Sequence, residues 1–205
     1  MLILALDTTA HFGSVELLED ASVVEEVLLH SPEGFGPVLF GQIEALLRRH
    51  GVRVFDVGLF AAAAGPGSFT GVRIGLTAVK GLAEACGRPV VGVSNLMALA
   101  ECGSGALRAA LLDARRGEIY GAVYDAELNV VQPEVVMGFP EWLAGLPAGV
   151  EFVSTDLGPF RVSGVEQRAL AGAVGRVALR LPWLDPAAVD ANYVRRSDAE
   201  LLWKE

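Results

Sequence analysis

The sequence predicts an α/β fold, and three features of it support that prediction. Apolar runs of strand length follow one another with longer segments of helical period between them. Glycines and prolines stand where these segments meet. The chain has 205 residues, of which 52% are hydrophobic and 20% charged, so one sizeable core or two small ones can be filled. A disordered or fibrous protein is excluded.

The first fifty residues predict three strands and a helix. The strands are expected at residues 2–6, 13–18 and 23–29, with tight turns between them. Residues 1–6 are apolar, but no basic residue precedes them and Asp7 ends the run, so we expect a buried strand of a cytoplasmic protein rather than a signal peptide. Residues 37–50 have a helical period that Gly51 stops.

The next segments alternate between strand and helix. We expect a strand at 57–64, a helix at 70–86 that Gly87 ends, a strand at 90–93 and a short helix at 95–101. This order indicates parallel pairing after an antiparallel opening. We therefore predict an N-terminal α/β lobe over residues 1–104.

The second half repeats the theme in a smaller lobe, which we place at residues 105–205. Strands are expected at 107–112, 118–124, 130–137 and 152–155, with helices at 139–146 and 167–181. The tail ends in Leu201, Leu202 and Trp203, and it is too apolar to stay undocked, so it can pack back on the first lobe.

Composition argues against several classes of protein. The net charge is −9, and the basic pairs at 48–49, 115–116 and 195–196 stand next to acidic residues, so the chain alone is not a nucleic-acid platform. The longest charge-free stretch, residues 57–72, contains a Gly-Pro-Gly turn and is too short to span a membrane. Cys86 and Cys102 form no CxxC motif and are expected to be reduced thiols.

The densest motif lies between the strand at 57–64 and the helix that follows it. A glycine turn at this place can bind phosphate, but the spacing fits neither a P-loop nor a nucleophile elbow. A sharp turn with Ser68 or Thr70 as helix cap is favoured over an anion site. The motif comprises Gly65, Pro66, Gly67, Ser68, Phe69, Thr70, Gly71 and Arg73.

The helix at 70–86 has more apolar surface than one sheet face can cover. Its polar residues, Arg73, Thr77, Lys80 and Glu84, fall on one narrow stripe. The excess is covered either by the rest of this chain or by another protein. We expect the second and predict a partner interface made of Leu39, Ile43, Val72, Leu76, Val79 and Ala83.

Five blocks of the sequence, at residues 4–9, 65–71, 90–94, 113–120 and 193–200, resemble the TsaB family, also called YeaZ. The resemblance implies a two-lobe fold of the actin, sugar kinase and Hsp70 type. It also implies a non-catalytic subunit that binds and activates a TsaD-like enzyme, with a TsaE-like ATPase, in the threonylcarbamoyl-adenosine modification of tRNA. A homodimer is expected when the partner is absent, and tRNA would be bound only through the complex.

The resemblance also bears on cofactors. Asp7, Thr8 and Thr9 stand where nucleotide-binding relatives of this fold hold phosphate, but no second phosphate loop follows, so we regard them as a remnant and expect no ATP. The three histidines lie in separate segments without the His-x-x-x-His pair of the catalytic family, so we expect no metal. ATP, metal and threonylcarbamoyl-adenylate would belong to the other proteins, and no catalytic residue is assigned.

Two departures from the family pattern and two other functions stay open. Residues 32–37 separate the His-Ser pair at 30–31 from the first helix, where family members run directly into it, and the second lobe is short. One alternative is a small metallopeptidase or kinase-like enzyme of the same fold with its own active site. Another is a homodimeric binding module with a proteolytic or chaperone-like task towards its sister subunit.

Overall fold

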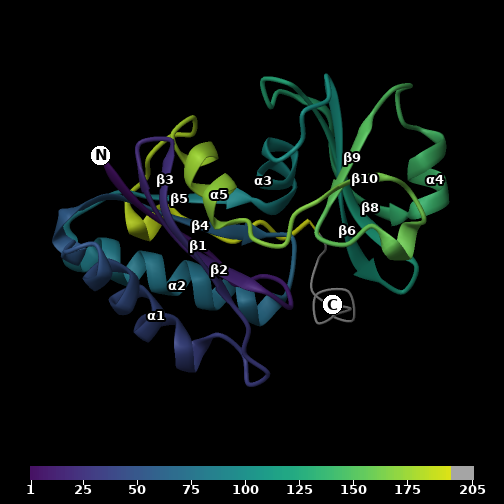
Figure 1. The fold of residues 1–205 in the computed structure, drawn as a ribbon. Coiled ribbons are helices and arrows are strands. Elements are labelled where there is room, and N and C mark those ends of the chain that lie inside the picture. The colour runs from purple at the N-terminus through teal and green to yellow at the C-terminus, as the bar shows by residue number, and fades with distance from the viewer. Residues whose placement is uncertain (195–205) are drawn as a thin grey trace, which may run out of the picture.

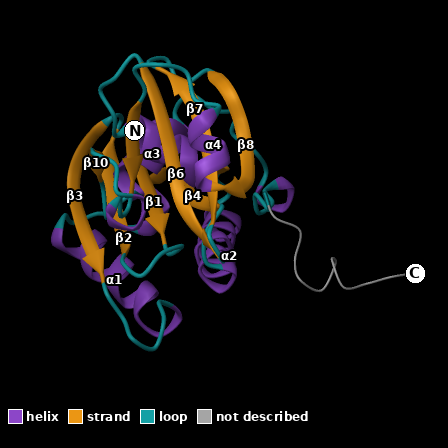
Figure 2. Ribbon diagram, turned by 90° about the vertical axis from the view of Figure 1, so that its right-hand side faces the viewer, coloured by secondary structure: helices purple, strands orange, loops and turns teal. Residues whose placement is uncertain are grey.

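A computed structural model describes residues 1–194 of the chain. Two five-stranded sheets form its framework, and helices cover their faces (Figure 1; Figure 2). The strand order is β3-β2-β1-β4-β5 in the first sheet and β10-β9-β6-β7-β8 in the second. Both sheets mix parallel and antiparallel pairs, and the predicted α/β class is confirmed.

The first sheet follows the predicted order of elements. Strand β1 pairs antiparallel with β2 and parallel with β4, β2 pairs antiparallel with β3, and β4 pairs parallel with β5. The antiparallel opening followed by a parallel layer is therefore confirmed. The bounds are β1 Leu2–Asp7, β2 Gly13–Glu19, β3 Ser22–Leu29, β4 Val57–Gly65 and β5 Val90–Ser94.

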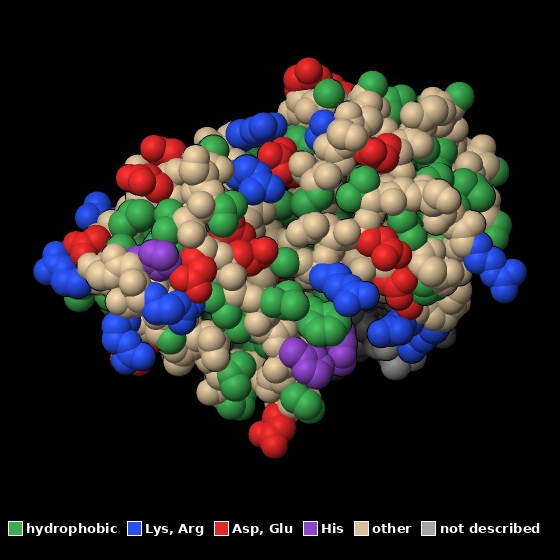
Figure 3. Space-filling view, viewed as in Figure 1, with side chains coloured by type: hydrophobic (Ala, Val, Ile, Leu, Met, Phe, Trp, Pro, Cys, Tyr) green, Lys and Arg blue, Asp and Glu red, His purple; other side chains and the backbone are tan. Residues whose placement is uncertain are grey.

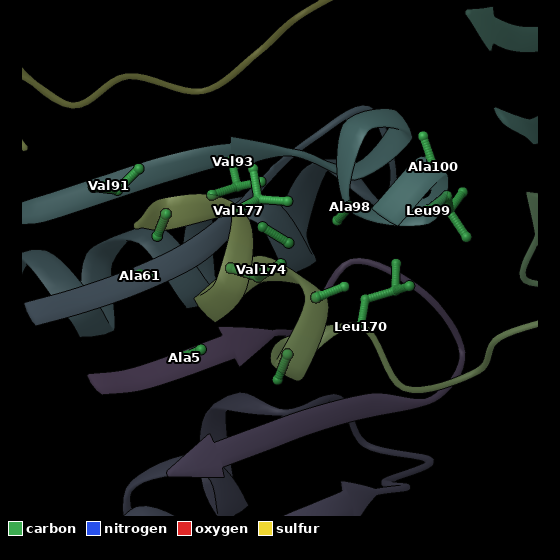
Figure 4. Close-up of a cluster of buried hydrophobic side chains, with 14 of the residues drawn as sticks. Ala5, Ala61, Val91, Val93, Ala98, Leu99, Ala100, Leu170, Val174 and Val177 are labelled. Atoms are coloured by element: carbon green, nitrogen blue, oxygen red, sulfur yellow. The ribbon is translucent and has the colours of Figure 1, made fainter. Parts of the chain in front are cut away.

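Helices cover both faces of the first sheet, which explains its apolar strands. Helices α1 (Gly36–Arg49) and α2 (Phe69–Cys86) pack on one face, and α3 (Asn95–Glu101) and α5 (Ala171–Ala178) on the other (Figure 1). Val174 and Val177 of α5 point towards Ala5 and Ala61 of the sheet (Figure 4). A strand buried on both faces needs a continuous apolar run rather than an alternating one.

The second sheet is built from residues 107–166. Its strands are β6 Leu107–Arg115, β7 Glu118–Asp125, β8 Val130–Gly138, β9 Glu151–Ser154 and β10 Gly164–Glu166. Helix α4 (Phe139–Ala144) packs Trp142 on one face, and residues of the other face join the core around α3. Three short 3₁₀ helices lie at Val54–Asp56, Gly158–Phe160 and Pro186–Ala188.

The C-terminal part differs from the prediction in two places. Strand β10 was not expected, and the helix predicted over 167–181 is the shorter α5. The amide of Gln167 donates to the carbonyl of Ser154 at 2.9 Å, which continues the ladder between β10 and β9 and keeps the chain extended there.

After α5 the chain returns to the first sheet. Leu184 bridges to Val90, and the backbone amide of Asn192 donates to the carbonyl of Ala64 at 2.7 Å.

Because the chain returns to the first sheet after α5, the predicted division into two lobes at residue 104 stays a proposal. Leu201, Leu202 and Trp203, whose docking was predicted, lie outside the described residues. Within residues 1–194, no helix is long and apolar enough to cross a bilayer.

Candidate functional site

The end of β1 and the turn after it direct Asp7, Thr8 and Thr9 into the protein, and all three are buried. Oδ1 of Asp7 accepts hydrogen bonds from the amide of Thr9 at 2.9 Å and from its hydroxyl at 2.6 Å. The Thr8 hydroxyl donates to the carbonyl of Gly71 at 2.7 Å. The predicted phosphate-loop remnant is therefore used to attach this turn to the start of α2.

The raised pKa of Asp7 also disfavours a magnesium role. Burial raises the pKa of Asp7, and this outweighs the opposing effect of the two hydrogen bonds from Thr9. Its Oδ2 has no hydrogen-bond partner among the described residues. Magnesium binds ionised carboxylates, so a carboxyl group held towards its neutral form is a poor ligand for it.

The glycine motif lets α2 approach the 7–9 turn closely. The amide of Ser68 donates to the carbonyl of Thr9 at 2.8 Å, and Oγ of Ser68 accepts from the amide of Gly71 at 3.2 Å, which confirms Ser68 as the helix cap. A Cβ on Gly67 would lie 2.8 Å from the carbonyl oxygen of Thr9, and one on Gly71 would overlap the carbonyl oxygen of Thr8. The motif therefore acts as a clasp between two backbones, residues 7–9 and 65–75.

A cleft of about 640 Å³ opens between the two sheets beside this clasp. Its lining mixes polar and apolar residues and includes Thr9, Ser68 and Asn95 from the first sheet's side. Arg115 is the only Lys or Arg among the described residues that line it, and it pairs with Asp113 at 3.2 Å. A cleft with one paired arginine has little positive charge to offset the phosphates of a nucleotide.

The predicted partner interface is corrected by the structure. Leu39, Ile43, Val72, Leu76, Val79 and Ala83 come together, but each is at most 6% exposed and all belong to one core with residues of the first sheet. Helix α1 packs beside α2, where a Cβ on Gly36 would meet the end of Ile74 at 3.9 Å. The flank is therefore covered by this chain, because helix spacing defines a face but not the element that packs on it.

The two helices present a different surface to solvent, which we call the helix face. Phe40 of α1 is 56% exposed, and Phe69 at the start of α2 is 49% exposed. Exposed small residues beside such aromatics allow another helix to approach. The helix face comprises Phe40, Gly41 and Glu44 of α1 with Phe69, Arg73, Thr77 and Gly81 of α2.

The motif residues Phe69 and Arg73 form an exposed stack with Tyr193. The guanidinium of Arg73 lies 3.7 Å from the Phe69 ring centroid and its Nε donates to the Tyr193 hydroxyl at 3.3 Å. The Phe69 and Tyr193 rings are 5.9 Å apart. Arg, Tyr and other aromatics are enriched at binding hot spots. Residues 195–200 of the last family block lie outside the described part of the chain.

Glu134 of β8 links the two sheets, and no feature of the sequence distinguishes it. Its Oε1 accepts from the hydroxyl of Tyr124 at 3.0 Å and from the hydroxyl of Ser94, the N-cap of α3. Its Oε2 accepts from the side-chain Nδ2 of Asn192 at 2.7 Å. Burial, with the charge of Glu134, raises the pKa of Tyr124, so Tyr124 stays a donor.

Two of the three histidines meet, although they are far apart in the sequence. Nε2 of His11 lies 3.2 Å from Nε2 of His30, whereas His50 pairs with Glu25 at 2.6 Å. Among the described residues, no group of three or more His, Cys, Asp or Glu side chains is placed to hold a metal. Cys86 and Cys102 are free, and burial raises the pKa of both thiols.

Comparison with known proteins gives consistent results. A family model for TsaD, the tRNA N6-adenosine threonylcarbamoyltransferase, matches residues 38–157. The tRNA threonylcarbamoyladenosine biosynthesis protein TsaB of Escherichia coli is 36% identical over 159 residues, which cover 71% of this chain and 68% of that protein. TsaB of Bacillus subtilis is 28% identical over 226 aligned residues, which cover 100% and 99% of the two chains.

A solved structure extends the likeness to the fold. The structure of YeaZ from Pseudomonas aeruginosa matches with a TM-score of 0.81 and 26% identity, over 94% of this chain and 99% of that one. The predicted two-lobe fold class is therefore confirmed.

Proposed function

The chain belongs to the TsaB (YeaZ) family of tRNA threonylcarbamoyladenosine biosynthesis proteins, and we propose that within this pathway it binds and activates a TsaD-type catalytic subunit without catalysing a step itself. The complex would include a TsaE-type ATPase and would work in the cytoplasm, where tRNA is modified. A second copy of this chain would occupy the same surface when the catalytic subunit is absent.

The helix face is the observation that carries this proposal. Phe40 and Phe69 are large, exposed aromatics, and Gly41, Thr77 and Gly81 are small, exposed residues of the same two helices. Helices approach to about 8 Å only where the residues between them are small. A TsaD-type subunit shares a family model with residues 38–157, which include most of α1 and all of α2, so its corresponding helices could pack against these as in a bundle.

The clasp around Asp7 argues against the kinase-like alternative. Its hydroxyl and amide groups are hydrogen-bonded within the protein, and the cleft beside it has one paired arginine among its described lining residues. Such a cleft offers no evident partner for the triphosphate of ATP. In our proposal the nucleotide and the metal of the reaction are bound by the other subunits.

Phe40→Glu tests the docking surface. An aromatic anchor at the centre of an interface contributes about 2 kcal/mol or more, so the variant should bind the catalytic subunit at least about thirtyfold more weakly. Sedimentation velocity of the two purified proteins measures this affinity, and circular dichroism checks that the variant keeps its fold.

Val130→Glu is the matched control. Val130 is 58% exposed on β8 of the second sheet, so this variant adds the same charge at a similar exposure, outside the helix face. We expect it to bind as the unaltered chain does. The docking surface is wrong if folded Phe40→Glu protein binds the catalytic subunit as tightly as the Val130→Glu control.

A further inference from the structure

His11 and His30 form a pair that the proposed function does not use. The register of β2 and β3 places Gly13 opposite Leu29, so the residues just before β2 and just after β3 lie together at one end of the sheet. Both imidazoles are exposed, and two histidines stand side by side on the surface next to hydrophobic and basic side chains (Figure 3).

The distance between the two nitrogens suits a shared metal ion. Two imidazole nitrogens that bind one tetrahedral Zn²⁺ at about 2.0–2.1 Å lie about 3.3 Å from each other. The two Nε2 atoms are 3.2 Å apart. A hydrogen bond between the nitrogens could have the same length, so the direction of the rings has to distinguish the two cases.

The ring positions differ from those of a straight hydrogen bond. At this nitrogen separation a straight N–H···N bond along both ring axes would place the centroids about 5.5 Å apart, whereas rings that converge on one tetrahedral ion lie about 5 Å apart. The centroids are 4.9 Å apart and the ring planes meet at 66°. The line between the two Nε2 atoms therefore does not run along both ring axes, as it would in a straight N–H···N bond.

The surroundings hold the two rings in this arrangement. The Phe12 ring lies 5.0 Å from that of His11 and 5.2 Å from that of His30, and the guanidinium of Arg168 lies 5.7 Å from its centroid. Side chains already fixed by packing lose less conformational entropy when they bind a ligand.

We propose that His11 and His30 bind one divalent transition-metal ion of the zinc class through their Nε2 atoms. Imidazole nitrogen suits Zn²⁺, Ni²⁺ and Cu²⁺, whereas Mg²⁺ requires oxygen ligands. A pocket of about 300 Å³ adjoins His11 and is lined by Ala10, His11, Phe12, Thr155, Asp156, Glu166 and Arg168. Water in that pocket can complete the coordination, because two side chains leave positions of a tetrahedral ion open.

Calorimetric titration of the tag-free, chelator-treated chain with ZnCl₂ tests the site. We expect a dissociation constant below about 0.1 mM for Zn²⁺ and no binding of MgCl₂. Loss of an outer-shell partner of a metal ligand already weakens binding about 10–100-fold, so His11→Gln and His30→Gln should each weaken it at least tenfold. Zn²⁺ should also raise the unfolding temperature of the unaltered chain but not of either variant.

His50→Gln is the control, since His50 is exposed and pairs with Glu25 instead of another histidine. It should bind Zn²⁺ as the unaltered chain does. Zinc binding weaker than about 0.1 mM, or equal binding by His11→Gln, His30→Gln and His50→Gln, would overturn the site.

Discussion

Glu16 of β2 and Glu26 of β3 stand directly opposite each other in the first sheet. Glu16 is 1% exposed, and α5 packs so closely on it that a Cβ on Gly172 would overlap its carboxyl group. Burial, and next the charge of Glu26, raise the pKa of Glu16 to about 7, while Arg176 acts in the opposite direction. Two carboxyl groups at this cross-strand position are compatible only if one of them holds a proton.

This pair makes folding stability depend on pH. Because the pKa of Glu16 is raised on folding from its ordinary value of 4.5 to about 7, its stabilising effect is complete below about pH 4.5 and is lost as the pH rises through 7. Glu16→Gln should therefore flatten the decline of the free energy of unfolding between about pH 5 and pH 8. At pH 8 the variant should be more stable than the unaltered chain. Urea denaturation across that range measures both effects.

Glu151→Gln provides the control for this experiment. The amides of Gly105 and Ser104 donate to Glu151 and lower its pKa, so its stabilising effect is already complete above its ordinary pKa of 4.5. This variant should have a lower free energy of unfolding than the unaltered chain, by the same amount at about pH 5 and at pH 8. If Glu16→Gln protein shows the same slope as the unaltered chain, Glu16 does not titrate in this range.

At the scale of elements, the clasp between α2 and the 7–9 turn is the contact that the glycine motif makes possible. Gly71→Ala should lower the free energy of unfolding by about 2 kcal/mol or more, because the new methyl group overlaps the backbone carbonyl of Thr8. Gly81→Ala is the matched control in the same helix, since nothing lies within 4 Å of the added Cβ. It should raise stability by about 0.5–1 kcal/mol.

Chemical denaturation of the two variants beside the unaltered chain makes the comparison. Equal effects of the two substitutions would show that α2 does not depend on close contact with the turn.

The same helix shows what could be predicted from the sequence. Its bounds follow from local signals: Ser68 caps it, and Gly87 ends it in the left-handed conformation with φ +61°. The cover of its apolar flank could not be predicted, because Leu76 and Val79 join one core with residues of α1 and the first sheet only through tertiary packing. The pairing of His11 with His30 could not be predicted either, because it depends on the register of two strands. The link from Glu134 to Ser94 depends on how the two sheets are oriented, which the sequence does not show.

At the scale of the whole molecule, the two sheets are tied together in a way that suits a scaffold. Glu134 connects β8 with α3 and with the segment that returns along β4. Net charge is −9, so the phosphate backbone of tRNA would be repelled rather than held over most of the surface. A scaffold that holds its own shape and leaves tRNA binding to its partners fits both observations.

Reconstituted modification of tRNA tests the central claim most directly. Threonylcarbamoyl-adenosine is measured with the TsaD-type subunit, the TsaE-type ATPase and the activated substrate, in the presence and absence of this chain. We expect product only when the TsaD-type subunit and this chain are both present, and a rate that falls with Phe40→Glu but not with Val130→Glu at concentrations near the dissociation constant. Full activity without this chain, or product from this chain without the TsaD-type subunit, would contradict the account.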